Sequence, residues 1–102
     1  MKPVRYHEAA ATELFDAVSH LELQKRALGK RFLAEIRRAE SVMARFPRAS
    51  KEIRPGIRKH VMRKFRYALI YSLENDGLVI SAVAHASRRP GYWVDRISTE
   101  DT

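Results

Sequence analysis

The chain has 102 residues, the length of one domain, and hydrophobic residues make up 45% of it, too many for a disordered chain. It contains no cysteine, which excludes disulfides and thiolate metal sites and fits a reducing compartment. The formal net charge is +8, and neither a signal peptide nor an apolar run of roughly 18 residues is visible, so we expect a basic cytoplasmic protein rather than a secreted or membrane protein.

The first half of the chain is predicted to form a short strand and two amphipathic helices. Residues 4–6 favour a strand, and residues 8–24 carry apolar side chains at spacings of three and four, the period of one helix face. A second stretch with this period covers residues 30–46, between Gly29, expected to break the chain, and Pro47, expected to end the helix. Together they predict a helical hairpin that packs on a sheet.

The second half is predicted to supply that sheet. After a loop at residues 47–57, three strand-like runs follow. They cover residues 58–64, 67–73 and 78–85. The sequence Glu74-Asn75-Asp76-Gly77 predicts a tight turn, so the last two runs are expected to pair as an antiparallel hairpin. The expected order is β-α-α-β-β-β.

This order predicts an α+β domain, with the helical hairpin packed on a small antiparallel sheet. The domain is expected to cover residues 1–97, and residues 98–102 form a polar C-terminal tail. Alternation predicts that the odd-numbered residues from 67 to 73 share one face. In the last strand, the even-numbered residues from 78 to 84 are expected to share one face, and the odd-numbered residues from 79 to 85 the other.

Basic residues are concentrated in the middle of the chain. Residues 48–66 hold eight basic side chains and one acid, a net charge of +7, whereas the first 47 residues carry +3 and the last 36 carry −2. A local basic stripe indicates an anionic partner, either nucleic acid or an acidic protein segment. A solvated strand face without a partner is the alternative.

The segment around the end of the last strand holds the side chains best suited to chemistry. Histidine titrates near neutral pH, so His85 is the candidate general acid or base, and a histidine that only bonds to nearby backbone is the alternative. Four guanidinium groups, which bind phosphate or carboxylate, are expected around one concavity. They belong to Arg63, Arg66, Arg88 and Arg89.

Two aromatic residues follow this segment. Tyr92 and Trp93 are expected either to stack on bases or, as we favour for Trp93, to pack back and close the sheet. The histidines lie far apart in sequence and have no second ligand at metal spacing, and the glycines do not cluster into a phosphate-binding loop. We therefore expect no metal and no cofactor.

Several motifs occur together in a fixed order. They are Leu28-Gly29-Lys30-Arg31-Phe32, Phe46-Pro47, Arg54-Pro55-Gly56-Ile57-Arg58, Phe65-Arg66-Tyr67-Ala68-Leu69-Ile70-Tyr71, and Val83-Ala84-His85 followed by Arg88-Arg89-Pro90-Gly91-Tyr92-Trp93. With these motifs at these spacings, the chain from residue 6 to residue 96 resembles the RelE/ParE superfamily, the toxins of type II toxin-antitoxin modules.

The resemblance implies a small toxin that forms a hetero-oligomer with a cognate antitoxin, whose acidic or amphipathic C-terminal segment neutralises it. RelE-like members cut messenger RNA on the ribosome, and ParE-like members block DNA gyrase. RelE-like nucleases carry an arginine where this chain has Ala68, and their arginine and tyrosine after the last strand align with Ser87 and Trp93. The chain therefore looks closer to the ParE-like arm, which acts by binding.

Three functions stay open at this point: a gyrase-binding toxin, a metal-independent, ribosome-dependent endoribonuclease, and a non-toxic basic interaction module. The antitoxin is expected to combine apolar contacts along the hairpin or a sheet edge with arginine-carboxylate pairs. The residues expected to contact the target or the antitoxin are Arg58, Arg63, Arg66, His85, Arg88, Arg89 and Tyr92.

Overall fold

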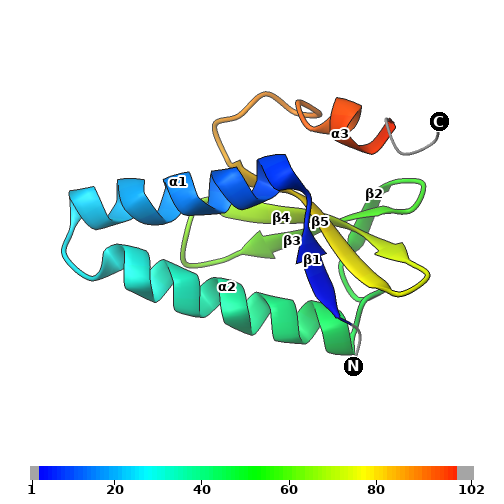
Figure 1. Ribbon diagram of the computed structural model, residues 1–102, viewed down its shortest axis with the longest axis horizontal. Coiled ribbons are helices and arrows are strands. Elements are labelled where there is room, and N and C mark those ends of the chain that lie inside the picture. Colours follow the sequence, from blue (N-terminus) through cyan, green and yellow to red (C-terminus); the bar gives the residue numbers. More distant parts are fainter. Residues whose placement is uncertain (1–2, 99–102) are drawn as a thin grey trace.

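Two long helices cover one face of a five-stranded sheet in the computed structural model, which describes residues 3–98 (Figure 1). In chain order the elements are β1 (Val4–Tyr6), α1 (Glu8–Gln24), α2 (Leu28–Arg45), β2 (Lys51–Arg54), β3 (Ile57–Met62), β4 (Tyr67–Glu74), β5 (Gly77–His85) and α3 (Val94–Ser98). The strand order is β1-β5-β4-β3-β2, and only β1 and β5 run parallel among the pairs described.

The predicted α+β class and the helical hairpin on a sheet are confirmed. The sheet has one strand and one parallel pair more than expected, and a short helix follows it. Ser98 is the last residue of that helix rather than the start of a tail, and residues 99–102 of the predicted tail lie outside the described residues. No helix within residues 3–98 is long and apolar enough to cross a membrane.

The main core lies between the helical hairpin and the sheet. Phe32 and Ile36 of α2 are fully buried against Leu69 and Tyr71 of β4 and Ile80 of β5. The predicted alternation in β4 is confirmed, because its odd-numbered residues face the helices.

A β-bulge at Ser81 changes which residues of β5 face the helices. Tyr71 pairs with Ile80 and Ile70 pairs with Ala82, so Ser81 is an extra residue in β5. After the bulge Val83 joins the main core, while Ala82 belongs to a second cluster on the opposite face. The predicted alternation in this strand is therefore wrong beyond Ile80, because it assumed an unbroken ladder.

The connection between α1 and α2 lies at residues 25–27 and not at Gly29. Gly29 is buried inside the first turn of α2. The close approach of α1 requires glycine here, because a side chain would clash with the carbonyl oxygen of Val18. The turn is made by Ala27, whose φ of 68° lies in the left-handed region. The Glu22 carboxylate accepts hydrogen bonds from the N–H groups of Ala27 and Gly29, at 2.8 and 3.0 Å, and so caps α2.

Part of the predicted loop at residues 47–57 is an edge strand. All four residues of β2 are exposed, so the strand lacks the apolar alternation that would reveal it. The predicted turn at Arg54-Pro55-Gly56 is present, and Gly56 has a φ of 77°.

On the face of the sheet away from the helices, a second cluster covers β3, β4 and β5. It consists of Ile57, Ile70, Ala82 and Trp93, with Tyr92, Val94 and Ile97 partly buried against it.

Candidate binding groove

A groove of about 320 Å³ lies over the face of the sheet opposite to the helical hairpin. Its floor includes the small side chains of Ala68 in β4 and Ala84 in β5. One wall comes from β2 and β3, where Ile53 and Val61 are 36% and 61% exposed. The other wall is the segment of residues 86–93 that follows β5. The groove therefore combines exposed apolar side chains with a concave floor, features that are common in binding surfaces.

Unpaired cations surround this apolar floor. Lys59, Arg66 and Arg89 line the groove and form no ion pair within residues 3–98. No aspartate or glutamate of the described chain lines it. The groove thus combines apolar contact area with positive charge, the properties that suit an acidic, partly apolar segment or a nucleic-acid backbone.

His85 lies in this groove, at the end of β5, with its ring tied to the next turn. Its Nδ1 accepts the backbone N–H of Ser87 at 3.0 Å and lies 2.8 Å from the Ser87 hydroxyl oxygen. The neutral ring therefore carries its proton on Nε2. The ring also stands edge-on to Tyr67, with 5.0 Å between the ring centroids.

The structure separates two of the predicted site residues from the groove. Arg63 lines another hollow, between α2 and β3. Arg58 donates to the carbonyl oxygens of Arg48 and Ser50, at 3.1 and 2.7 Å, and so fastens the chain before β2. The expectation of four guanidinium groups around one concavity is therefore wrong for Arg63. Within β3 the basic stripe is divided between both faces of the sheet, because successive residues point to opposite sides. Arg63 lies beyond the strand, in the turn at residues 63–66.

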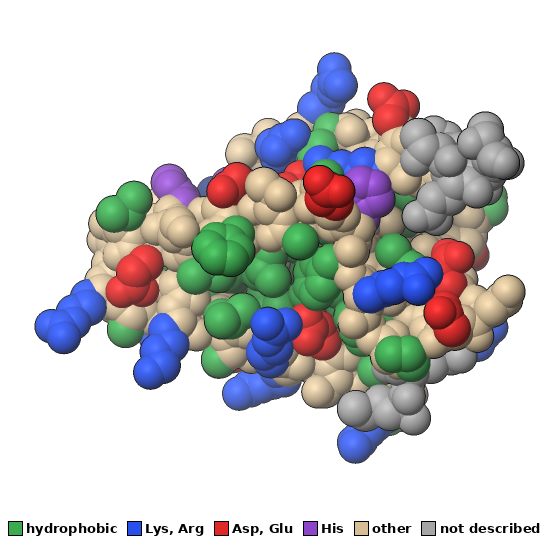
Figure 2. Space-filling view, in the orientation of Figure 1, with side chains coloured by type: hydrophobic (Ala, Val, Ile, Leu, Met, Phe, Trp, Pro, Cys, Tyr) green, Lys and Arg blue, Asp and Glu red, His purple; other side chains and the backbone are tan. Residues whose placement is uncertain are grey.

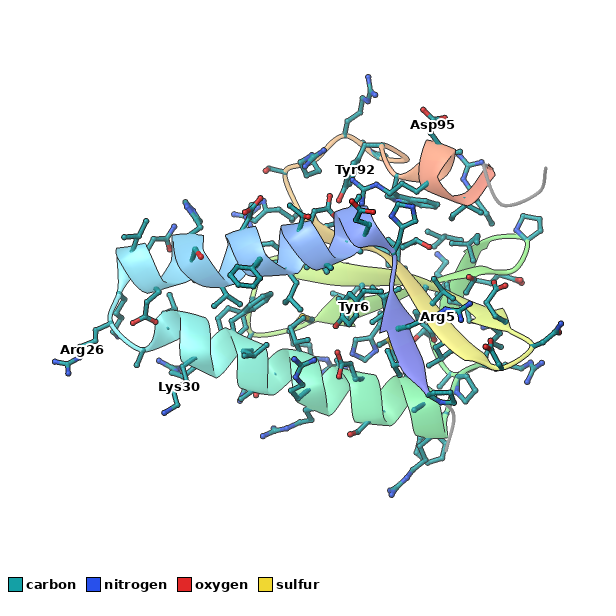
Figure 3. All side chains as sticks on the ribbon, viewed as in Figure 1. Arg5, Tyr6, Arg26, Lys30, Tyr92 and Asp95 are labelled. Atoms are coloured by element: carbon teal, nitrogen blue, oxygen red, sulfur yellow. The ribbon has the colours of Figure 1, made fainter. Side chains whose placement is uncertain are left out.

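Tyr92 and Trp93 have different roles in the wall of the groove. Trp93 is only 5% exposed and packs onto the sheet in the second cluster, as the closing role predicts. The Tyr92 ring lies under the guanidinium of Arg88, at 3.8 Å from its centroid. Figure 3 places Tyr92 between α1 and the C-terminal segment. Its hydroxyl donates to the Glu13 carboxylate at 2.8 Å.

Glu13 of α1 is the central contact of this wall, and it is not among the residues predicted from the sequence. Arg96 donates to its two oxygens at 2.8 and 2.9 Å, and the backbone N–H of Val83 donates to it at 2.9 Å. Arg88 lies 4.0 Å from the same carboxylate. A signal existed, because Glu13 follows Ala10 by three residues and precedes Ala17 by four, on the buried helix face.

These contacts determine the protonation states of Glu13 and Tyr92. Burial would raise the pKa of Glu13, but hydrogen bonds from Arg96, Val83 and Tyr92 outweigh it and hold the pKa below its usual value of 4.5. Burial, with the bond to Glu13, raises the pKa of Tyr92 to about 12. At neutral pH Glu13 is charged and Tyr92 is protonated, so Tyr92 is the donor.

This arrangement, a helical hairpin on one face of a sheet and a basic groove on the other, defines a small α+β domain with one candidate binding surface. The fold is similar to that of a chain from the chromosomal ParDE TA system from P. aeruginosa, with a TM-score of 0.71 and 11% sequence identity over 83% of this chain and 96% of that one. No match is found among curated proteins. Residues 4–90 match the family described as ParE toxin of type II toxin-antitoxin system, parDE, so the chain belongs to this family.

Proposed function

We propose that the chain inhibits growth by binding DNA gyrase in the cytoplasm, and that a cognate antitoxin neutralises it. Family membership supports a toxin with an antitoxin partner. The observation that favours binding over catalysis is the groove itself, which presents an apolar floor and unpaired cations but no carboxylate of the described chain. A binding surface of this kind acts through its contacts and requires no proton transfer.

Metal-free RNA cleavage would need a base, an acid and a cation that stabilises the phosphorane. His85 is the only histidine of residues 3–98 in the groove. Burial raises the pKa of Tyr67, and Tyr92 is bonded to Glu13. Ala68 supplies no polar group where RelE-like nucleases place an arginine.

An antitoxin segment of acidic and apolar side chains fits the same groove. Its apolar residues would cover Val61 and the floor, and its carboxylates would pair with Lys59, Arg66 and Arg89. The endoribonuclease remains the second candidate, because His85 lines the groove together with these cations.

Induction of the chain alone is expected to arrest bacterial growth, and co-expression of the antitoxin is expected to restore it. Arg66→Glu and Arg89→Glu should each weaken toxicity, whereas Arg63→Glu, which makes the same charge change outside the groove, should not. Normal growth at high levels of folded protein would contradict the toxin function.

His85→Ala separates the two mechanisms. A gyrase-binding toxin should keep most of its toxicity and should inhibit supercoiling by purified gyrase. A nuclease should lose cleavage by roughly 10²-fold, the usual contribution of a positioned acid or base. New 5′ ends of messenger RNA that vanish in His85→Ala, with supercoiling unaffected by the unmodified chain, would overturn the gyrase proposal.

A further inference from the structure

We propose that Glu13 is a positioning residue of the groove, which holds the wall at residues 86–93 against α1 and so sets the shape that a partner meets. The inference rests on the proposed binding function of the groove. Glu13 does not line the groove and lies on a different element from the wall. Its effect on binding therefore passes through the side chains that it holds.

The wall has few other attachments to the domain. At its start, the Ala86 N–H donates to the carbonyl oxygen of Arg66 at 2.8 Å. The later backbone hydrogen bonds that involve residues 88–96 are local and join residues three apart. Side chains hold the rest of the segment, and Tyr92, Val94 and Ile97 are partly buried against the second cluster. Trp93 fastens it to the far face of the sheet, and the Glu13 carboxylate fastens it to α1.

The Glu13 anchor is strong because it is bidentate and shielded from water. Both carboxylate oxygens accept from Arg96, and the two side chains are only 15% and 19% exposed. Removing one partner of such a pair leaves the other charge buried without compensation. Glutamine at this position would keep one acceptor oxygen of the two, so it could accept from Tyr92 or from Val83 but not from both. Arg88 would lose its counter-charge in the same change.

Glu13 and Arg96 also form hydrogen bonds with backbone groups at the free edge of β5. β1 covers β5 only as far as Ile80, so the next outward backbone groups of β5 have no neighbouring strand. The Val83 N–H donates to Glu13, and the Ser81 carbonyl oxygen accepts from Arg96 at 3.1 Å. Helix α1, the edge of β5 and the wall therefore meet at one carboxylate.

Glu13 also decides which arginines are free for a partner. It holds Arg88 over the Tyr92 ring, whereas Arg66 and Arg89 form no ion pair within the described chain. When the charge of Glu13 is removed, Arg88 is released and the wall can move away from the floor. The groove then loses its shape before the main core is disturbed.

Cysteine labelling can measure this movement, because the chain has no cysteine of its own. Ala84→Cys places a thiol on the groove floor, and Val61→Cys places one on the opposite wall. In the Glu13→Gln background, the reaction of iodoacetamide with Ala84→Cys is expected to become about tenfold faster, as for a segment that opens locally. Val61→Cys should react at the same rate in both backgrounds.

Asp16→Asn is the matched control, because it removes one negative charge from the exposed side of the same helix. Asp16→Asn should change the labelling rate of neither Ala84→Cys nor Val61→Cys. If Glu13→Gln does not fold, Arg96→Lys replaces it, since lysine keeps the charge but loses the bidentate fork. Arg96→Lys is expected to speed labelling of Ala84→Cys by a smaller factor. Equal rates at Ala84→Cys in the folded variant and in the parent would overturn the inference.

Growth arrest by Glu13→Gln supplies the functional readout, and we expect it to be weaker than that of the parent at equal levels of folded protein. Full toxicity together with faster labelling would also overturn the inference, because the wall would then not matter for binding. A parent chain that does not arrest growth would contradict the proposed function alone. The labelling result would still decide whether Glu13 positions the wall.

Discussion

Glu13 is expected to make the stability of the domain depend on pH in the acidic range. Its pKa is lower in the folded chain than its usual value of 4.5, so the unfolded chain binds the proton first. Its contribution is complete above that value and is lost as the pH falls from about 4.5 toward the folded pKa. The free energy of unfolding of Glu13→Gln, measured with urea at several pH values, should therefore fall less steeply with acid than that of the parent.

Asp16→Asn serves as the control for this measurement too. Asp16 is exposed on α1 and makes no hydrogen bond or ion pair within residues 3–98. The variant should follow the pH profile of the parent. A Glu13→Gln profile parallel to that of the parent would show that the carboxylate contributes nothing through its charge.

Gly29→Ala is expected to destabilise the domain although alanine is the better helix former. A Cβ at residue 29 would clash with the carbonyl oxygen of Val18, a backbone atom that cannot move without shifting α1. The overpacking should cost about 2 kcal/mol in the free energy of unfolding. The opposite change at an exposed position of α2, Ala34→Gly, should cost about 1 kcal/mol through helix propensity alone. A more stable Gly29→Ala variant would contradict the close packing of the two helices.

At the scale of elements, the turn between α1 and α2 carries an avoidable strain. Ala27 adopts a φ of 68°, a region that costs a residue with a Cβ about 1–2 kcal/mol. Ala27→Gly should relieve this cost, and the extra freedom of glycine in the unfolded chain should cancel part of the gain. We expect a net stabilisation of about 0.5 kcal/mol, measurable as a higher urea midpoint. A lower midpoint would mean that the turn is not strained.

The helices could be predicted from the sequence because each buries one face and shows that face in its period. The central strands β4 and β5 are buried on both faces, and they could be predicted as apolar runs bounded by turn residues. β2 could not, since its four residues are all exposed. The bulge at Ser81 could not either, because an extra residue in a ladder leaves no mark in an apolar strand. Gly29 was misread because a glycine that ends a helix and one that lets two helices approach look alike in sequence.

The candidate site was predictable where its residues are neighbours in the chain. His85, Arg88, Arg89 and Tyr92 come from one segment, and they all line the groove. The contacts that shape this segment join residues 79 and 83 positions apart, from Glu13 to Tyr92 and to Arg96. Periodicity within an element carries no information about such pairs. The period of the sequence also does not show that Arg63 lies on the side of α2.

At the scale of the whole molecule, the charge of +8 predicts that partner binding depends on salt. Positive side chains are spread over the surface, and Figure 2 shows lysines and arginines along the outer side of α2 on the face in view. Long-range attraction of this kind is screened as salt rises from about 0.05 to 0.5 M. The antitoxin should therefore associate more slowly and bind less tightly at high salt, as measured by calorimetry and stopped flow.

Arg89→Glu is expected to reduce this salt dependence, because the variant removes one of the free cations of the groove. Arg63→Glu makes an equal change in net charge and tests whether total charge or the groove matters. An affinity that does not change with salt would show that apolar contact alone holds the partner.

The pairing of the first strand with the last has a consequence for the order of events during synthesis. β1 lies beside β5, and Val4 pairs with Leu78. Contacts between such distant residues form late, because the intervening chain must first be brought together. As the chain leaves the ribosome, α1 and α2 emerge before the strands that they cover, so their sheet-facing sides remain uncovered until those strands follow. Nascent chains stalled before β5 is exposed should be digested by protease, whereas chains released after residue 98 should resist it.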